Sequence, residues 1–238
     1  RYISEDNYKK PYEMQVQTTP AIETIKADVA NKNINHYRVY NLAVNTFNDA
    51  STSYHFPSIG GYHGAKLQRY QDIIDLHILN PKYKQQDLAD TSLLSQNQIR
   101  QFFYTYQNQI NCPNLDVLNM LDTKYFILPL GQEGGMAVEN PEACGAAWFV
   151  DEIKNVNTAD EEILALNNFK PKKTAIVNKE FSLQIKDIAN RDKNATITLQ
   201  ATKNNNPDIK IYKTTSATAQ LCVFSEIYYK EGWKAYID

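Results

Sequence analysis

Residues 54–70 read YHFPSIGGYHGAKLQRY and lead from a turn containing proline and glycine directly into a helix with apolar periodicity. This segment holds three of the eight glycines and two of the four histidines of the chain. Where a loop meets the start of a helix, backbone N–H groups and the positive end of the helix dipole face outward, so ligand contacts concentrate there. The segment lacks the G-x-G-x-x-G and P-loop spacings. It is therefore the first candidate for a binding loop, without a recognised nucleotide motif.

Helices and strands are predicted on both sides of this loop. Thr19 and Pro20 mark the start of a helix that should run to about Asn33, since a hydroxyl caps the free N–H groups and proline is tolerated in the first turn. Alternation over residues 36–42 predicts a strand. Apolar spacing predicts further helices over residues 64–80, 99–106 and 115–121.

A continuous apolar run at residues 123–130 predicts a strand buried on both faces. Residues 131–145 are rich in turn formers and are interpreted as a bridge. Shorter strands are predicted at residues 146–150 and 173–177, with a helix beginning at residues 157–162 between them. This order of elements predicts helices packed on a mixed sheet.

The pattern changes after residue 178. Alternating runs separated by turn signals predict strands at residues 181–185, 195–201, 209–212 and 219–225, and residues 236–238 are interpreted as the start of another. The predicted fold class is therefore α+β, with helices on a mixed sheet followed by an antiparallel β-sandwich-like region. The predicted domains are residues 1–178, which include the loop, and residues 179–238.

Composition excludes some classes of function. The chain has 238 residues, 42% of them hydrophobic, and a formal net charge of -2, which is typical of a globular protein and argues against a nucleic-acid partner. The one dense basic run, at residues 170–173, is interpreted as a solvated turn. No run approaches 18 apolar residues and no leader precedes the first helix, yet the chain begins with Arg1, so we expect a piece of a longer protein.

The cysteines and histidines give no metal pattern. Cys112, Cys144 and Cys222 lie far apart without a C-x-x-C pair, which leaves one disulfide and one free thiol open. His55 and His63 lie on the loop, but no third ligand follows at a recognised spacing, so no metal or other cofactor is predicted.

The loop does carry groups that suit a sugar phosphate. Phosphate binding needs cations, and sugar binding needs aromatic faces and hydrogen-bonding groups. The predicted ligand-binding residues are Arg38, Tyr62, His63, Lys66 and Arg69. The alternative is that the glycines only shape a turn and the aromatic side chains fix it to the core.

No catalytic residue is identified from the pattern. Ser58 lacks the G-x-S-x-G context of a serine nucleophile. Asp49 and Asp72 are the acids nearest the loop, and neither is assigned a catalytic role. Trp148 and Trp233 are expected to anchor the core.

Several strings of the sequence are similar to those of one family and occur in the family's order. They are Gly60-Gly61-Tyr62-His63-Gly64-Ala65-Lys66 with Arg69-Tyr70, Val117-Leu118-Asn119-Met120-Leu121 with Lys124-Tyr125-Phe126, Asn140-Pro141-Glu142, Ala147-Trp148-Phe149-Val150, and Phe224-Ser225-Glu226-Ile227-Tyr228-Tyr229 with Gly232-Trp233. From about Arg38 to Asp238 the chain resembles the extracytoplasmic C-terminal part of the YfhO-like bacterial membrane proteins.

The resemblance implies a function for a larger protein. The family resembles multi-spanning membrane glycosyltransferases of the C-type superfamily, which use a lipid-phosphate-linked sugar and whose catalytic acid lies in an early extracytoplasmic loop that has no counterpart in this chain. It implies an extracytoplasmic domain, inactive alone, whose partners are the membrane part of the same parent chain and a sugar or lipid-linked sugar. Two alternatives stay open: a non-enzymatic carbohydrate-binding or cell-envelope interaction module, and a folding scaffold without a ligand.

Overall fold

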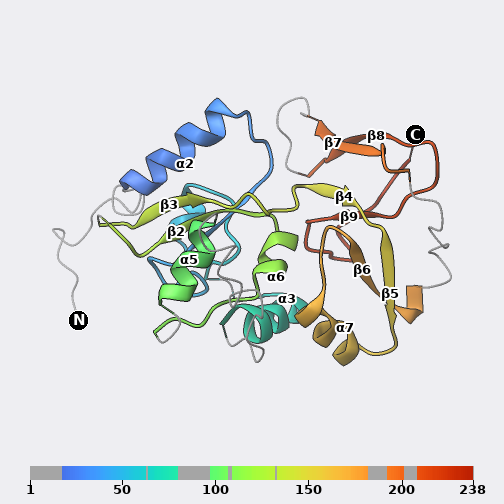
Figure 1. The fold of residues 1–238 in the computed structure, drawn as a ribbon, viewed down its shortest axis with the longest axis horizontal. Helices are drawn as coiled ribbons and strands as arrows, with labels where there is room; N and C mark the ends of the chain where they lie inside the picture. Colours follow the sequence, from blue (N-terminus) through green and yellow to red (C-terminus); the bar gives the residue numbers. More distant parts are fainter. Residues whose placement is uncertain are drawn as a thin grey trace, which may run out of the picture.

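The computed structural model of the protein describes residues 18–62, 64–79, 97–106, 109–131, 133–181, 192–200 and 208–237. The described residues form helices together with mixed, antiparallel and parallel sheets, and the fold class is α+β (Figure 1).

The first half is built on a three-stranded sheet. Strand β2 (Thr123–Leu128) lies in its centre, with β1 (Arg38–Asn41) parallel on one side and β3 (Met136–Glu139) antiparallel on the other. Nearly every residue of β2 is buried, which confirms the strand predicted from its continuous apolar run. Strand β3 is not predicted by the sequence, because the turn formers of residues 131–145 indicate a bridge.

Helix α2 (Pro20–Asn31) covers one face of this sheet. The Thr19 hydroxyl accepts a hydrogen bond from the Ile22 N–H at 3.4 Å, so the predicted start of the helix is confirmed. Ile22 and Ile25 pack in one buried cluster with Tyr125 and Ile127 of β2. Tyr125 and Ile127 are two residues apart, so their side chains lie on the same face of β2, as the two-residue period of a strand requires.

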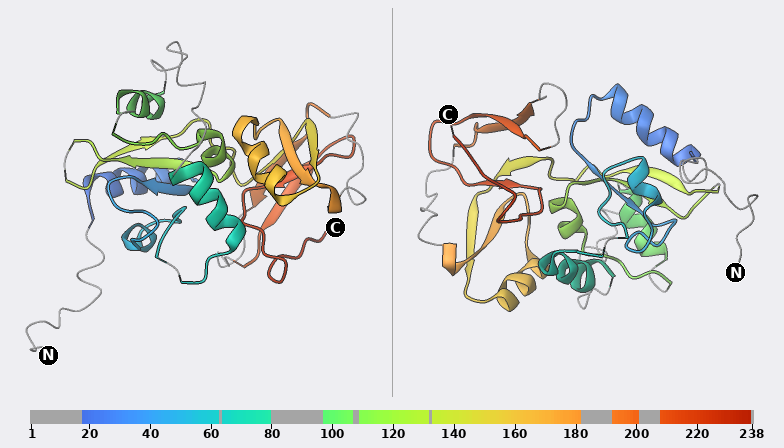
Figure 2. Two further views of the ribbon diagram at one scale, coloured as in Figure 1. Left: turned by 90° about the horizontal axis from the view of Figure 1, so that it is seen from below. Right: turned by 180° about the vertical axis from the view of Figure 1, so that it is seen from behind.

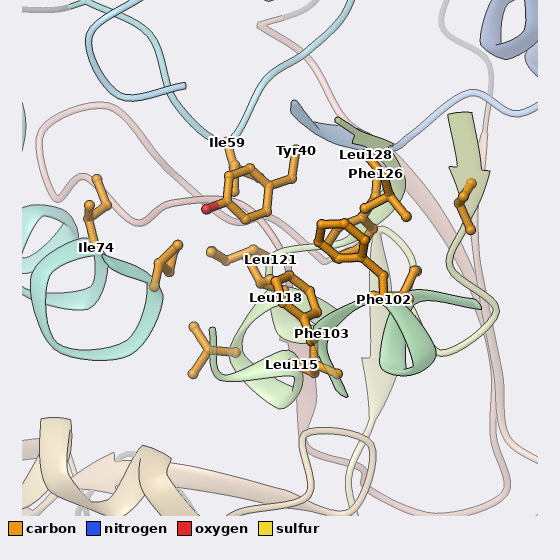
Figure 3. Close-up of a cluster of buried hydrophobic side chains, with 14 of the residues drawn as sticks. Tyr40, Ile59, Ile74, Phe102, Phe103, Leu115, Leu118, Leu121, Phe126 and Leu128 are labelled. Atoms are coloured by element: carbon orange, nitrogen blue, oxygen red, sulfur yellow. The ribbon is translucent and has the colours of Figure 1, made fainter. Parts of the chain in front are cut away.

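The opposite face carries the larger core. It is covered by α3 (Gln68–Ile73), its π-helical continuation η3 (Ile74–Leu79), α5 (Gln98–Thr105) and α6 (Leu115–Met120). Phe103 and Leu118 from these helices meet Phe126 of β2, as Figure 3 shows. Figure 2 shows α2 and α5 on opposite sides of the sheet.

The helix predicted over residues 64–80 begins later and changes its geometry. Its first helical residue is Gln68, and it widens into π-helix from Ile74. The His77 carbonyl oxygen accepts a hydrogen bond from the Asn114 N–H at 2.7 Å, just before α6. The periodicity of apolar residues identifies the buried face, but it does not show this contact from a distant segment.

Three two-stranded sheets follow. Strand β4 (Ala147–Phe149) pairs antiparallel with β9 (Cys222–Phe224), and β5 (Glu152–Val156) pairs parallel with β6 (Thr174–Asn178). Between β5 and β6 lie α7 (Ala159–Ala165), capped by Thr158, and the short helix η5 (Leu166–Asn168). The last pair is β7 (Thr196–Gln200) with β8 (Ile211–Thr215), antiparallel. Two further 3-10 helices lie in the described residues, η2 (Ser51–Tyr54) and η6 (Lys179–Phe181).

The predicted sandwich is not confirmed. Strand β9 pairs with β4, which lies before the predicted boundary at residue 178, whereas β7 and β8 pair with each other. Most of the strand predicted at residues 181–185 lies outside the described residues, and Phe181 ends η6. Residues 225–237 form no strand, so the further strand expected at Tyr236 and Ile237 is absent there. Alternation predicts strands in this region but not their partners.

Candidate functional site

The glycines of the predicted binding loop give it a tightly packed shape. The Gly61 N–H donates to the Thr46 carbonyl oxygen at 2.7 Å, and a Cβ at Gly60 would overlap that same oxygen. Gly61 has a φ of 130°, a backbone conformation that residues other than glycine rarely adopt. The Tyr70 hydroxyl donates to the Ile59 carbonyl oxygen from the side of α3. The loop is thus held between the segment after β1 and the first turn of α3.

The predicted site residues on this loop lie in different environments. Tyr62 is 76% exposed. The Lys66 Nζ donates to the Phe47 carbonyl oxygen at 3.3 Å and lies 5.7 Å from the centre of the Phe47 ring. The Arg69 side chain is 70% exposed and approaches Glu180 at 4.0 Å. His63 lies outside the described residues.

Arg38, the fifth predicted residue, lies in a half-buried charge cluster. Its Nη1 donates to the carbonyl oxygens of Leu121 at 2.7 Å and Ser225 at 2.9 Å, and its Nη2 lies 3.3 Å from Glu226. Among the described site residues, Arg38 is therefore engaged with these groups, whereas Lys66 and Arg69 make other contacts. Arg38 makes its contacts with the end of α6 and with the segment after β9.

The charge cluster consists of His36, Arg38, Asp122, Lys210 and Glu226. The two ring nitrogens of His36 contact two carboxylates, with Nδ1 at 2.6 Å from Asp122 and Nε2 at 3.2 Å from Glu226. Lys210 approaches Glu226 at 3.5 Å. Asp122 sits between α6 and β2 with a φ of 53° and also accepts the Gly145 N–H at 3.0 Å. Segments from both halves of the chain thus meet in this cluster.

The hydrogen bonds within the cluster favour the ionised forms of His36 and Glu226. The hydrogen bond from His36, with Arg38 and Lys210 nearby, lowers the pKa of Glu226 to about 2, although burial acts in the opposite direction. Burial lowers the pKa of His36, but the hydrogen bonds to Asp122 and Glu226 outweigh it and raise the pKa above its ordinary value. Burial and the charge of Glu226 raise the pKa of neighbouring Tyr212 to about 12.

This arrangement links distant segments of the chain and engages both ring nitrogens of His36, which argues against acid–base chemistry on a substrate. A histidine hydrogen-bonded to a carboxylate is a common catalytic pair, but the second ring nitrogen must then face the substrate. In His36 that nitrogen contacts Glu226. The imidazole of His36 lies between two carboxylates and links the segment before β1 to the segment after β9.

Sequence reasoning misses most of this cluster. Glu226 lies in one of the strings that resemble the family and His36 is two residues from Arg38, yet no pattern points to either as a site residue. Their partners are far away along the chain, and a single sequence gives no signal for such pairs. Two acids near the loop have local roles: Asp49 accepts the Ser51 N–H at 2.7 Å, and Asp72 accepts from Gln68 at 2.7 Å.

The expectation of a core anchor is met for Trp148 and not for Trp233. Trp148 is buried and its Nε1 donates to the Pro171 carbonyl oxygen at 2.7 Å. Trp233 is half-buried, and its Nε1 donates to the nearby Ile227 carbonyl oxygen at 3.2 Å. The basic run at residues 170–173 forms a turn, in which the Lys173 N–H donates to the Lys170 carbonyl oxygen at 2.9 Å.

Three further observations concern similarity to known proteins, metal sites and membrane-spanning helices. Comparisons with protein-family models, with curated proteins and with solved structures gave no match to this chain. Within the described ranges, no group of three or more His, Cys, Asp or Glu side chains is arranged to hold a metal ion. None of the helices in those ranges combines the length and apolar character that crossing a bilayer requires.

Proposed function

We propose that this chain is the extracytoplasmic domain of a YfhO-like multi-spanning membrane glycosyltransferase. In that protein it assists the binding of the acceptor or of the lipid-linked sugar and carries no catalytic step of its own. The proposal combines the resemblance of the sequence strings with the surface formed by the glycine-shaped loop.

The observation that carries the binding role is a pair of exposed tyrosines on a tightly held support. Tyr62 follows Gly61, and Tyr54 ends η2, which lies against the same turn: a Cβ at Gly61 would be 3.5 Å from the Ser53 hydroxyl oxygen. Both tyrosine side chains are exposed. Sugars bind to exposed aromatic faces next to hydrogen-bonding groups, and a support fixed before binding keeps the entropic cost low.

Arg69 adds a cation on the helix that follows the loop. Its side chain is mostly exposed, and its ion pair with Glu180 is a long one of 4.0 Å at the surface. Such a pair stabilises the fold little, so Arg69 is available for a phosphate. Lys66 differs, because its ammonium group is engaged with Phe47.

The test uses the full-length membrane protein. Tyr54→Ala with Tyr62→Ala, and separately Arg69→Ala, should reduce sugar transfer from a lipid-linked donor in membranes while protein levels stay unchanged. Tyr236→Ala is the matched control, since Tyr236 is also an exposed tyrosine but lies in the C-terminal segment. Unchanged transfer in the loop variants would remove the loop from the acceptor and donor sites.

A non-enzymatic carbohydrate-binding or cell-envelope module is the second candidate. It is favoured by the exposed side chains of Tyr228, Tyr229, Tyr236 and Ile237, which follow β9. The gene sequence that flanks the region encoding this chain distinguishes the two candidate functions. Many membrane spans with an acidic first extracytoplasmic loop support the glycosyltransferase, and a lone signal peptide supports the module.

A further inference from the structure

Arg100 on α5 is a buried cation with unused hydrogen-bond donors. The residue is 6% exposed, and its Nη2 donates to the Glu142 Oε2 at 2.9 Å. Its Nε and Nη1 are also buried and have no hydrogen-bond partner in the part of the chain that the structure describes. A buried guanidinium ordinarily engages an anion through two parallel N–H groups, so this one is incompletely satisfied.

A second donor points at the same oxygen. The Asn119 Nδ2 lies 3.5 Å from the Glu142 Oε2. Asn119 is held in turn by Asn140, whose Nδ2 donates to the Asn119 Oδ1 at 2.8 Å and to the Thr123 carbonyl oxygen at 2.9 Å. These side chains come from α6 and from the residue after β3, so the donors are fixed before any ligand arrives. Arg100 and Asn119 together form what we call the anion cradle.

Glu142 occupies this cradle from the solvent side. Its side chain is 42% exposed, whereas that of Arg100 is buried. One oxygen, Oε2, makes the contacts with both Arg100 and Asn119. A phosphate group has more acceptor oxygens than a carboxylate, so it can engage Nη2 and one of the two unpartnered nitrogens of Arg100 while another oxygen accepts from Asn119.

We propose that the anion cradle of Arg100 and Asn119 binds the phosphate group of a small molecule, which displaces the Glu142 carboxylate from it. The site is separate from the glycine-shaped loop and does not depend on the glycosyltransferase function.

Glu142→Ala tests the site by removing the internal competitor. The backbone of residue 142 keeps its hydrogen bond, since the Glu142 N–H donates to the Asn140 Oδ1 at 3.1 Å. Isothermal titration with inorganic phosphate at constant ionic strength should show one saturable site, about tenfold or more tighter than in the unchanged chain. The Arg100 Nε–H signal in a proton–nitrogen NMR spectrum should move along the same titration curve.

Glu23→Ala is the matched control. It removes the same charge beside another cation, Lys26, but at an exposed position away from both proposed sites. We expect it to bind phosphate no more tightly than the unchanged chain does. The proposal is overturned if Glu142→Ala binds no phosphate, if Glu23→Ala binds it equally well, or if the Arg100 Nε–H signal stays fixed while heat is released. Glu142→Ala leaves the buried Arg100 without its carboxylate partner, so circular dichroism first checks that each variant is folded. Glu142→Gln, whose amide oxygen still accepts a hydrogen bond from Arg100, repeats the titration in a second variant without the competing charge.

Discussion

At the residue scale, Gly61 carries a requirement that can be tested directly. Its φ of 130° is in a region that glycine occupies freely and other residues rarely do. Gly61→Val should therefore lower the free energy of unfolding by about 1–3 kcal/mol, the usual cost of such backbone strain. Urea denaturation followed by circular dichroism measures it.

Gly64→Val is the control for this prediction. A Cβ at Gly64 would meet nothing within 4 Å, and its backbone is not in the positive-φ region. The two variants add the same side chain to the same loop, so their difference isolates the conformation of Gly61. Equal losses in the two proteins would show that the turn does not need glycine at position 61.

At the element scale, local signals predict the elements but not their partners. The starts of the two helices capped by Thr19 and Thr158 can be predicted, because capping residues act within one turn. Strand β2 can be predicted from its apolar run. Strand β5 escapes prediction because it carries Glu152, Lys154 and Asn155, which strands usually lack. The pairing of β9 with β4 escapes it too, because that pairing depends on segments that no local pattern connects.

The same limit applies to the candidate site. The glycine-shaped turn can be anticipated from its composition, and Gly61 does need its special conformation. The surroundings of Arg38 cannot be anticipated from the sequence, because its partners Leu121, Ser225 and Glu226 come from remote parts of the chain. Lys66 is expected from the sequence to face a ligand and instead contacts Phe47, a residue on the segment after β1.

The β4–β9 pair gives a prediction for Val223. Val223 lies opposite Trp148, between hydrogen bonds from the Val150 N–H to Leu221 at 3.1 Å and from the Ser225 N–H to Ala146 at 3.0 Å. Antiparallel bonding alternates, so the Val223 N–H faces β4. Val223→Pro should lower the free energy of unfolding by about 1–3 kcal/mol, because a ladder bond is lost and its acceptor left unsatisfied.

Cys222→Pro tests the register behind this prediction. The N–H of Cys222 faces away from β4 in the same alternation, so its replacement should cost clearly less. Trp148 fluorescence during urea denaturation reports the loss at the pair itself. If proline at position 222 were as damaging as proline at position 223, the pairing of Val223 with Trp148 would be incorrect.

At the scale of the whole molecule, the charge cluster makes stability depend on pH. The folded pKa of Glu226, about 2, is below its ordinary 4.5, so its contribution is complete above pH 4.5 and is lost as the pH falls toward 2. The folded pKa of His36 is above its ordinary 6.5, so its contribution is complete below pH 6.5 and is lost as the pH rises through the folded value. From these two groups, stability should be greatest between pH 4.5 and 6.5.

Glu226→Gln tests both limbs of this curve. The free energy of unfolding near pH 6 should fall by about 1–3 kcal/mol, and its decline in acid should become shallower. Loss of the Glu226 charge should also flatten the alkaline limb, because it removes a cause of the raised pKa of His36. Glu180→Gln, at an exposed position, should leave the curve unchanged. Parallel curves for Glu226→Gln and the unchanged chain would contradict the role of the cluster.

The pairing of β4 with β9 has a consequence for how the chain folds. During synthesis β4 emerges early, but its partner exists only once the chain has been made as far as Phe224. The central sheet has a similar delay, because β1 must wait for β2. Contacts between such distant segments are slow to form, and strand edges without their partners are exposed in the meantime. Production of this protein should therefore benefit from slow synthesis at low temperature, which gives the late strands time to reach the early ones.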